Sequence, residues 1–123
     1  MIALSIRVPW INLIMRGKKT IELRSWQTSY RGRLLLVTSK TIDKDAPRWP
    51  HIPPLPLGHA VGYCQLVRCR PMLPADVNDA RCPYTPGYYS WNLADIRPIK
   101  PFPVRGKLRL FDVPLPQSKG IIP

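Results

Sequence analysis

Glu22 is the residue whose surroundings suggest chemistry most directly. It is the one glutamate of the chain, and it lies in the stretch GKKTIELRSWQTSYRG at 17–32. Four cationic side chains are close to it in sequence, those of Lys18, Lys19, Arg24 and Arg31. Neighbouring cations favour the charged form of a carboxylate. Glu22 could therefore hold Lys19 or Arg24 in place and accept a hydrogen bond from an exocyclic amine of a nucleobase. The alternative is an ion-pair cluster that braces the corner between a helix and a strand.

The spacing of these charges leaves one geometric question open. In a regular strand the side chain of Lys19 would point away from those of Glu22 and Arg24, because side chains alternate between the two faces. Either a bulge follows Gly17 or Lys19 still belongs to a turn. If neither holds, Lys18 shares a face with Glu22 instead.

The chain as a whole is strongly basic, which narrows the classes of partner. Its 123 residues include 19 Lys+Arg against 7 Asp+Glu, a formal net charge of +12, and 12 of the cations are Arg. A guanidinium matches phosphate with two hydrogen bonds and stacks on bases. This charge points first to nucleic acid or a nucleotide-like ligand. The alternative is a basic surface without a specific partner.

Aromatic and hydroxyl side chains supply further candidates. Trp26 and Trp91 could stack on bases, an interaction worth roughly 1–3 kcal/mol per base, or could belong to the core. Trp10 is expected in the core because of its helical spacing to Leu13 and Ile14. A triplet at the end of a buried strand could read a base edge or simply cap the strand, and it consists of Thr38, Ser39 and Lys40.

The hydrophobic pattern predicts one early helix followed by short strands. The helix is expected at 9–16, with Gly17 at its C-terminal cap. Strands are expected at 3–8, 20–24, 34–40, 58–68, 88–93 and 107–113, with a helical turn at 74–80. Many short strands with one helix indicate an α+β fold, a small mixed β-barrel with one or two short helices.

Proline distribution and chain length define the organisation. We expect one domain at 1–115 and a loose C-terminal tail at 116–123. Residues 46–57 read APRWPHIPPLPL and predict an extended surface loop outside the sheet. Such a loop could bind a groove of the SH3 type, so a protein-interaction adaptor is a distant alternative function.

Three cysteines bear on compartment and metal binding. Cys64, Cys69 and Cys82 are odd in number and lack zinc-ligand spacing with His59, so we expect no metal and no cofactor. Cys64 is expected to be a small core residue. The cysteines fit a reducing compartment, and no stretch is long and apolar enough to span a membrane. We expect a cytoplasmic, intracellular monomer without a membrane partner.

Several motifs in order resemble the ASCH domain family. LSIRVPWINLIMRGKKTIELRSWQTSYRGRLLLVTSK contains a PW helix, then G-x-K-x-x-E-x-R, then R-G-x-L. The second pattern is filled by Gly17, Lys19, Glu22 and Arg24, and the third begins at Arg31. Downstream, GHAVGYCQLVRC and FPVRGKLRLFDV resemble the central and closing strands of that family.

This resemblance implies a fold and a place for a ligand. ASCH domains are similar to PUA, YTH and EVE domains, which share a PUA-like β-barrel and mostly bind RNA or modified nucleobases in a cleft beside it. The implied function is binding of RNA, another single-stranded nucleic acid or a nucleoside-like ligand in a basic cleft. The candidate binding residues are Lys19, Glu22, Arg24, Ser25, Trp26, Arg31, Thr38, Ser39, Lys40 and Trp91.

The resemblance also implies an enzymatic alternative. Some small bacterial ASCH proteins hydrolyse N4-acylated cytidine with a lysine, a threonine and a late glutamate, and others are described as ribonucleases. Lys19 matches the lysine, but Glu22 stands where the threonine is expected, and no glutamate follows it. Thr20 is a substitute nucleophile. The catalytic candidates for such a hydrolase or ribonuclease are Lys19, Thr20 and Glu22.

Overall fold

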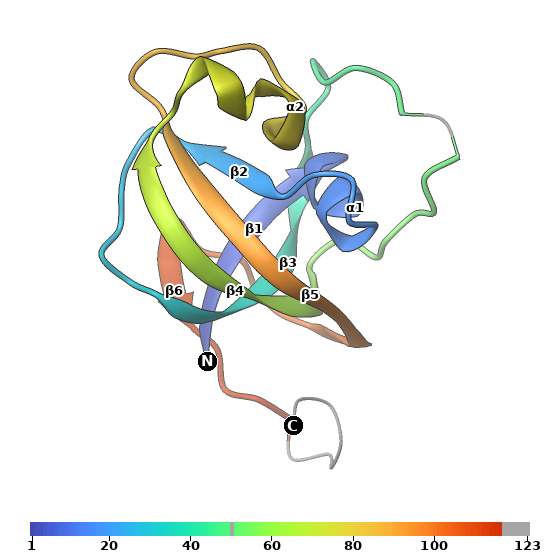
Figure 1. Ribbon diagram of the computed structural model, residues 1–123. Coiled ribbons are helices and arrows are strands. Elements are labelled where there is room, and N and C mark those ends of the chain that lie inside the picture. Colours follow the sequence, from blue (N-terminus) through green and yellow to red (C-terminus); the bar gives the residue numbers. More distant parts are fainter. Residues whose placement is uncertain (50, 117–123) are drawn as a thin grey trace.

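The computed structural model describes residues 1–49 and 51–116 and folds them around one mixed β-sheet (Figure 1). Its strands are β1 (Ile2–Val8), β2 (Ile21–Arg24), β3 (Gly32–Ile42), β4 (His59–Pro71), β5 (Tyr89–Pro103) and β6 (Leu110–Asp112). The helices between them are short: α1 (Trp10–Met15), the 3-10 helix η1 (Pro74–Asp76) and α2 (Val77–Ala80). The fold is α+β, and none of the helices in the described residues is long and apolar enough to cross a membrane.

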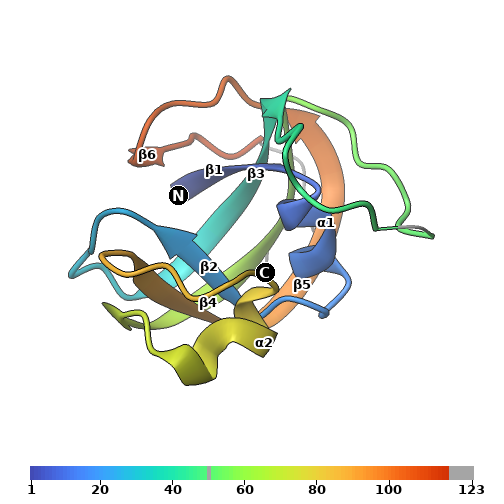
Figure 2. The ribbon, with the colours of Figure 1, turned by 90° about the horizontal axis from the view of Figure 1, so that it is seen from above.

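The sheet order leaves two edge strands that face each other without pairing. The order is β2-β5-β4-β3-β1-β6, and among the described residues β1 and β3 form the one parallel pair. Register shifts between β4 and β5 occur at three places, and such bulges bend and twist a strand. The sheet therefore curls, so that β2 approaches β1 and β6 across an open side (Figure 2).

The hydrophobic core lies inside the curl and under α1. Side chains of β1, β3 and β4 pack there with Ile11 and Ile14 of α1 and with Trp91 of β5. Gly62 of β4 lets the helix approach closely, because a Cβ at this position would lie 2.6 Å from the carbonyl oxygen of Arg97 and 2.8 Å from Sδ of Met15. Cys64 is fully buried on β4, as expected.

Several elements expected from the sequence are confirmed, within a few residues at their ends. The early helix, the helical turn after 73, and the strands at the positions of β1 to β4 are present. Residues 46–49 and 51–57 contain no strand, in agreement with the proline-rich loop. The predicted tail at 116–123 lies, from residue 117 on, outside the described residues.

The last two strands differ from the prediction. β5 continues ten residues beyond the expected end at residue 93, through Pro98, Pro101 and Pro103. These prolines are tolerated because β2 pairs with β5 only as far as Asn92, so the later part has β4 on one side alone. The final strand is shorter than expected, because 104–109 form a loop and only Leu110–Asp112 pair with β1.

Asp76 anchors the η1–α2 segment to the sheet. Its carboxylate accepts two hydrogen bonds from Arg70, both at 2.9 Å, and one each from the Leu73 amide and the Ser90 hydroxyl. Burial raises the pKa of this carboxyl, but the hydrogen bonds outweigh it and lower the pKa from 3.8 to about 2. The segment that Asp76 holds ends at Ala80, whose carbonyl forms part of the site below.

The pKa of Asp76 predicts a pH dependence of stability. Because the folded-state pKa is depressed, the ionised group contributes stability that is present above pH 3.8 and lost as the pH falls toward about 2. We expect this group to account for a loss of about 2 kcal/mol over that interval. Urea unfolding of the wild type and Asp76→Asn from about pH 6 to pH 2 measures it. Asp79→Asn, at an exposed position of α2, is the control, and an identical pH profile for both variants would contradict the assignment.

Candidate functional site

A large cleft opens where the edges of the curled sheet approach each other. Its volume is about 1020 Å³. Two strands form its walls, β1 and β2, together with the end of β3 and the loops at 82–88 and 105–109. Its lining residues are Ser5, Arg7, Trp10, Lys19, Glu22, Leu23, Arg24, Ser25, Trp26, Ser39, Lys40, Thr41, Cys82, Thr85, Tyr88, Arg105, Gly106, Lys107, Leu108 and Arg109. The volume is at the upper end of ordinary ligand sites.

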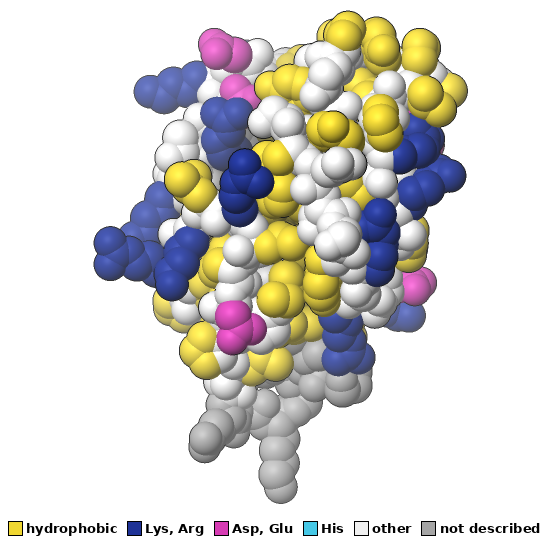
Figure 3. Space-filling model, turned by 90° about the vertical axis from the view of Figure 1, so that its left-hand side faces the viewer, with side chains coloured by type: hydrophobic (Ala, Val, Ile, Leu, Met, Phe, Trp, Pro, Cys, Tyr) yellow, Lys and Arg dark blue, Asp and Glu magenta, His cyan; other side chains and the backbone are white. Residues whose placement is uncertain are grey.

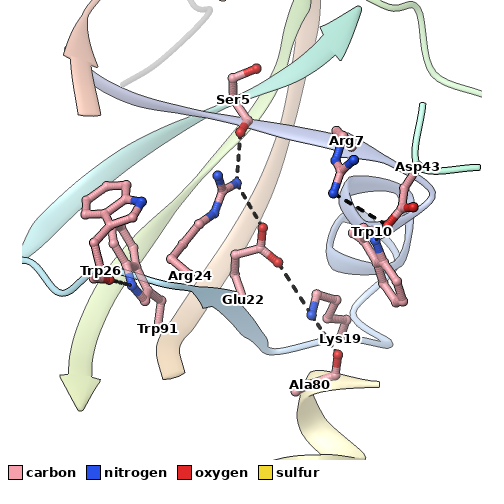
Figure 4. A network of polar contacts seen from close by, with 10 residues as sticks. All are labelled: Ser5, Arg7, Trp10, Lys19, Glu22, Arg24, Trp26, Asp43, Ala80 and Trp91. Carbon is pink, nitrogen blue, oxygen red and sulfur yellow. Dashed lines mark hydrogen bonds and ion pairs between the residues drawn. The ribbon is translucent and has the colours of Figure 1, made fainter. Parts of the chain in front are cut away.

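One guanidinium nitrogen connects the two walls of the cleft. Arg24 Nη2 donates to Glu22 Oε2 at 3.0 Å within β2 and to the carbonyl oxygen of Ser5 on β1 at 2.9 Å (Figure 4). Glu22 and Arg24 lie two residues apart on one strand, so both side chains point to the same face. The alternation of β2 therefore places a carboxylate and a guanidinium together at the floor of the cleft.

Lys19 is a buried cation on the other side of Glu22. Its side chain is 2% exposed, its Nζ donates to the carbonyl oxygen of Ala80 at 2.6 Å, and Nζ lies 3.5 Å from Glu22 Oε1. The same ammonium lies 5.3 Å from the ring centroid of Trp10, a cation–π contact. Lys19 lies in the connection between α1 and β2 and not in the strand itself. Its side chain therefore does not follow the alternation of β2 and can point toward Glu22. Glu22 is thus paired with a cation on each side. The ion-pair cluster expected from the sequence is present, and its carboxylate also lines the cleft.

The tryptophans divide between cleft and core. Trp26 follows β2 and lines the cleft, with the guanidinium carbon of Arg109 4.8 Å from its ring centroid. Trp91 is fully buried, contacts Trp26 edge to face at 4.7 Å between centroids, and donates from Nε1 to the Trp26 carbonyl at 3.3 Å. Trp10, expected in the core, is half-buried: it packs against the core cluster and also lines the cleft. Its indole donates to Asp43 Oδ2 at 2.8 Å, a bond that needs the ring edge at the surface.

Cations surround the mouth of the cleft. They are Arg7, Lys40, Arg105, Lys107 and Arg109, all exposed. The carboxylate of Asp43 lies 3.7 Å from Arg7 Nη2. The pKa of Asp43 is lowered by the hydrogen bond from Trp10, by backbone hydrogen bonds and by the charge of Arg7, and burial acts in the opposite direction. Figure 3 shows one face of the molecule, on which lysine and arginine side chains lie on the left, near the centre and on the right, interspersed with hydrophobic ones. Such a rim attracts polyanions.

Seven of the ten predicted binding residues line this cleft. They are Lys19, Glu22, Arg24, Ser25, Trp26, Ser39 and Lys40. The other three do not. Arg31 donates to the carbonyls of Thr28, Tyr30 and Cys69. Thr38 is fully buried and donates to the carbonyl of His59. Trp91 is in the core. Thr20, the substitute nucleophile, is exposed and does not line the cleft.

Other lining residues were missed by the sequence analysis. Ser5 contributes a backbone carbonyl, which no side-chain pattern could reveal. The loop RGKLR at 105–109 overlaps the strand expected at 107–113, yet it carries three cations and Leu108, which is 93% exposed. The three charges within five residues, with Leu108 as the one large apolar side chain, were the signal in the sequence that indicated a loop. Cys82 also lines the cleft, and burial raises the pKa of its thiol.

The fold and the cleft define a small α+β protein with a polar, cation-rimmed site on the open side of its sheet. The family model for the ASCH domain matches residues 4–103. The chain belongs to the ASCH domain family. β6 follows the matched region and completes the sheet by pairing with β1.

Comparisons with known proteins and solved structures found partial similarities. The chain is similar to Activating signal cointegrator 1 of Homo sapiens, with 44% identity over 45 residues, and of Mus musculus, with 47% identity over 36 residues. These matches span 7% and 6% of those proteins, so this chain corresponds to a small part of them. The crystal structure of ASCH from Zymomonas mobilis has a TM-score of 0.60 at 16% identity, covering 83% of this chain and 72% of that chain. A mutant of that protein also gives a TM-score of 0.60. At this identity the likeness concerns the fold.

The buried pair of Lys19 and Glu22 predicts a strong coupling in stability. Glu22→Gln removes the counterion of a cation that is 2% exposed, so we expect a loss of about 3 kcal/mol in the free energy of unfolding. Lys19→Met should also destabilise the protein. The double variant should lose less than the sum of the two, because neither charge is then left buried alone. Urea unfolding of the four proteins measures this, and strictly additive losses would contradict a coupled pair.

Proposed function

We propose that this protein binds RNA or another single-stranded nucleic acid, with one base in the cleft and the phosphates at its rim. One observation carries the proposal: a carboxylate fixed between two cations lies at the floor of a cleft of about 1020 Å³ whose mouth is lined by exposed Arg and Lys. Glu22 can accept from an exocyclic amine, whereas the rim cations suit phosphate oxygens. Single-stranded nucleic acid presents both kinds of group.

Each wall of the cleft has a defined part in this proposal. Trp26 offers a ring for base stacking, with Trp91 packed behind it in the core. Ser25 and Ser39 offer hydroxyl groups to base edges or sugars. Arg24 is committed to Glu22 and to the Ser5 carbonyl, so its part is to fix the position of Glu22 and to keep the two walls at a constant separation.

The same proposal includes the PUA-like β-barrel of this superfamily. The described strand pairings do not join β2 to β6. We take the curled sheet as a barrel that side chains close along the cleft, through the contact of Arg24 with Ser5 and that of Arg109 with Trp26. The ligand would then enter between strands that do not share backbone hydrogen bonds.

The hydrolase alternative receives less support from the geometry. Lys19 donates to the Ala80 carbonyl and pairs with Glu22, so its ammonium group already has two partners within the protein. Thr20 is exposed outside the cleft. Mass spectrometry of N4-acetylcytidine and of a short RNA after incubation with the protein tests this alternative, and we expect both to remain intact.

Salt dependence and a single substitution test the binding function. Fluorescence anisotropy with a labelled single-stranded RNA should show an affinity that falls by about 0.7 log units per log unit of salt for each phosphate neutralised. Trp26→Leu should weaken binding by roughly 1–3 kcal/mol through lost stacking. Trp49→Leu, whose side chain does not line the cleft, is the matched control. An affinity that does not change with salt, together with no effect of Trp26→Leu, would refute the proposal. Parallel titrations with single-stranded DNA and with duplexes define the class of nucleic acid that is bound.

A further inference from the structure

A second hollow adjoins the cleft and shares two cations with it. Its volume is about 350 Å³, and it is lined by Lys40, Gly58, Pro103, Val104 and Arg105. Lys40 and Arg105 line the large cleft as well. The two hollows are therefore neighbours, with an exposed ammonium and an exposed guanidinium where they meet. Among the described residues that line the second hollow, none carries a carboxylate.

Backbone hydrogen bonds fix the second hollow to three strands. The Gly58 amide donates to the Thr38 carbonyl on β3 at 2.9 Å, and the Val104 amide, just after β5, donates to the Gly58 carbonyl at 3.0 Å. Figure 2 shows the segment after β5 passing the end of β3 on its way to β6. These bonds join Gly58 to β3, which carries Lys40, and to Val104, which directly precedes Arg105 in the loop after β5.

Gly58 makes room for Lys40 at this junction. It has φ +67, and a Cβ there would lie 3.0 Å from Cε and 3.3 Å from Cγ of Lys40. The lysine stem therefore lies against the glycine, in space that a side chain would take. A residue other than glycine would fill part of the hollow and push the lysine stem aside, so this position tests the space of the hollow without removing a charged group.

The sizes of the hollows suit a polymer better than a single nucleoside. Ligand sites commonly measure roughly 300–1,000 Å³, and each hollow is within or near that range by itself. Consecutive nucleotides of a single strand are joined by one phosphate, which carries a negative charge. A cation pair between two hollows matches this chemistry, because charge-assisted bonds to phosphate are the strong ones.

We propose that the two hollows form one track for consecutive nucleotides, with Lys40 and Arg105 binding the phosphate between them. The inference rests on the proposed function and adds a second nucleotide site to it. The large cleft takes one base, the second hollow takes the adjacent nucleotide, and the shortest complete ligand is a dinucleotide. The specificity for a base stays with the Glu22 cleft, whereas the second hollow distinguishes a strand from a free nucleoside.

The test compares ligands of different length on a charge-removal variant. NMR titration measures millimolar as well as micromolar affinities, and the probes are a nucleoside 5′-monophosphate, a dinucleoside monophosphate and a tetranucleotide. In the wild type we expect the dinucleoside monophosphate to bind about tenfold more tightly than the mononucleotide, equal to about 1.4 kcal/mol. In Lys40→Ala/Arg105→Ala this ratio should fall to near one. The matched control is Lys44→Ala/Arg97→Ala, which removes the same charge at exposed positions outside both hollows and should keep the ratio.

A second variant removes the hollow without removing charge. Gly58→Asn fills the space with a residue that tolerates positive φ, and thermal melting confirms that the variant folds. The mononucleotide affinity should be unchanged and the gain from the second nucleotide lost. Equal affinities for the mono- and dinucleotide in the wild type, or a ratio retained in both test variants, would overturn the second site and leave the proposed function standing. Absence of any nucleotide or oligonucleotide binding would overturn both.

Discussion

The cleft depends on a single guanidinium nitrogen that spans a break in the sheet. Arg24 Nη2 bonds Glu22 on its own strand and the Ser5 carbonyl on β1, where no backbone hydrogen bonds join the two strands. A side chain thus replaces a strand ladder at this point. Full strand pairing would have closed the sheet and removed the opening, whereas no contact at all would have left the edges free to separate. A long, planar donor with several N–H groups meets this requirement in a way that lysine does not.

Glu22 belongs to a buried ion-pair cluster and also lines the cleft, whereas the sequence left a brace and a cleft position as alternatives. The carboxylate is 6% exposed and Lys19 is 2% exposed, so the pair is a buried one and the cost of desolvating it is large. The Ala80 carbonyl and the face of Trp10 provide the remaining partners of the ammonium. Asp76 holds the segment that delivers Ala80. Three separate parts of the chain therefore position the floor of the site: the start of α1, the segment from Lys19 to Arg24, and the segment from Asp76 to Ala80.

The sequence was informative where side chains follow a local period and uninformative where distant segments meet. Alternation along β2 placed Glu22 and Arg24 together correctly, and the triplet at the end of β3 supplied two lining residues. Thr38 and Trp91, predicted as binding residues with a strand cap and the core as their alternatives, lie outside the cleft. The burial of a hydroxyl or an indole depends on partners far along the chain, here His59 and Trp26. Arg31, also predicted to bind, does not line the cleft, because its guanidinium donates to nearby carbonyls instead. The cation-bearing loop at 105–109 escaped notice because its alternation resembles a strand.

The late prolines of β5 affect how this protein behaves beside other copies of itself. From residue 94 on, β5 has β4 on one flank and no strand on the other among the described residues. An unpaired strand edge is a template on which another chain can add by β-pairing, the first step of aggregation. Pro98, Pro101 and Pro103 carry no N–H, so this part of the strand has fewer donors with which another chain could pair. The sheet thus stays open along the cleft, whereas its other exposed edge is a poorer template for pairing with a second copy.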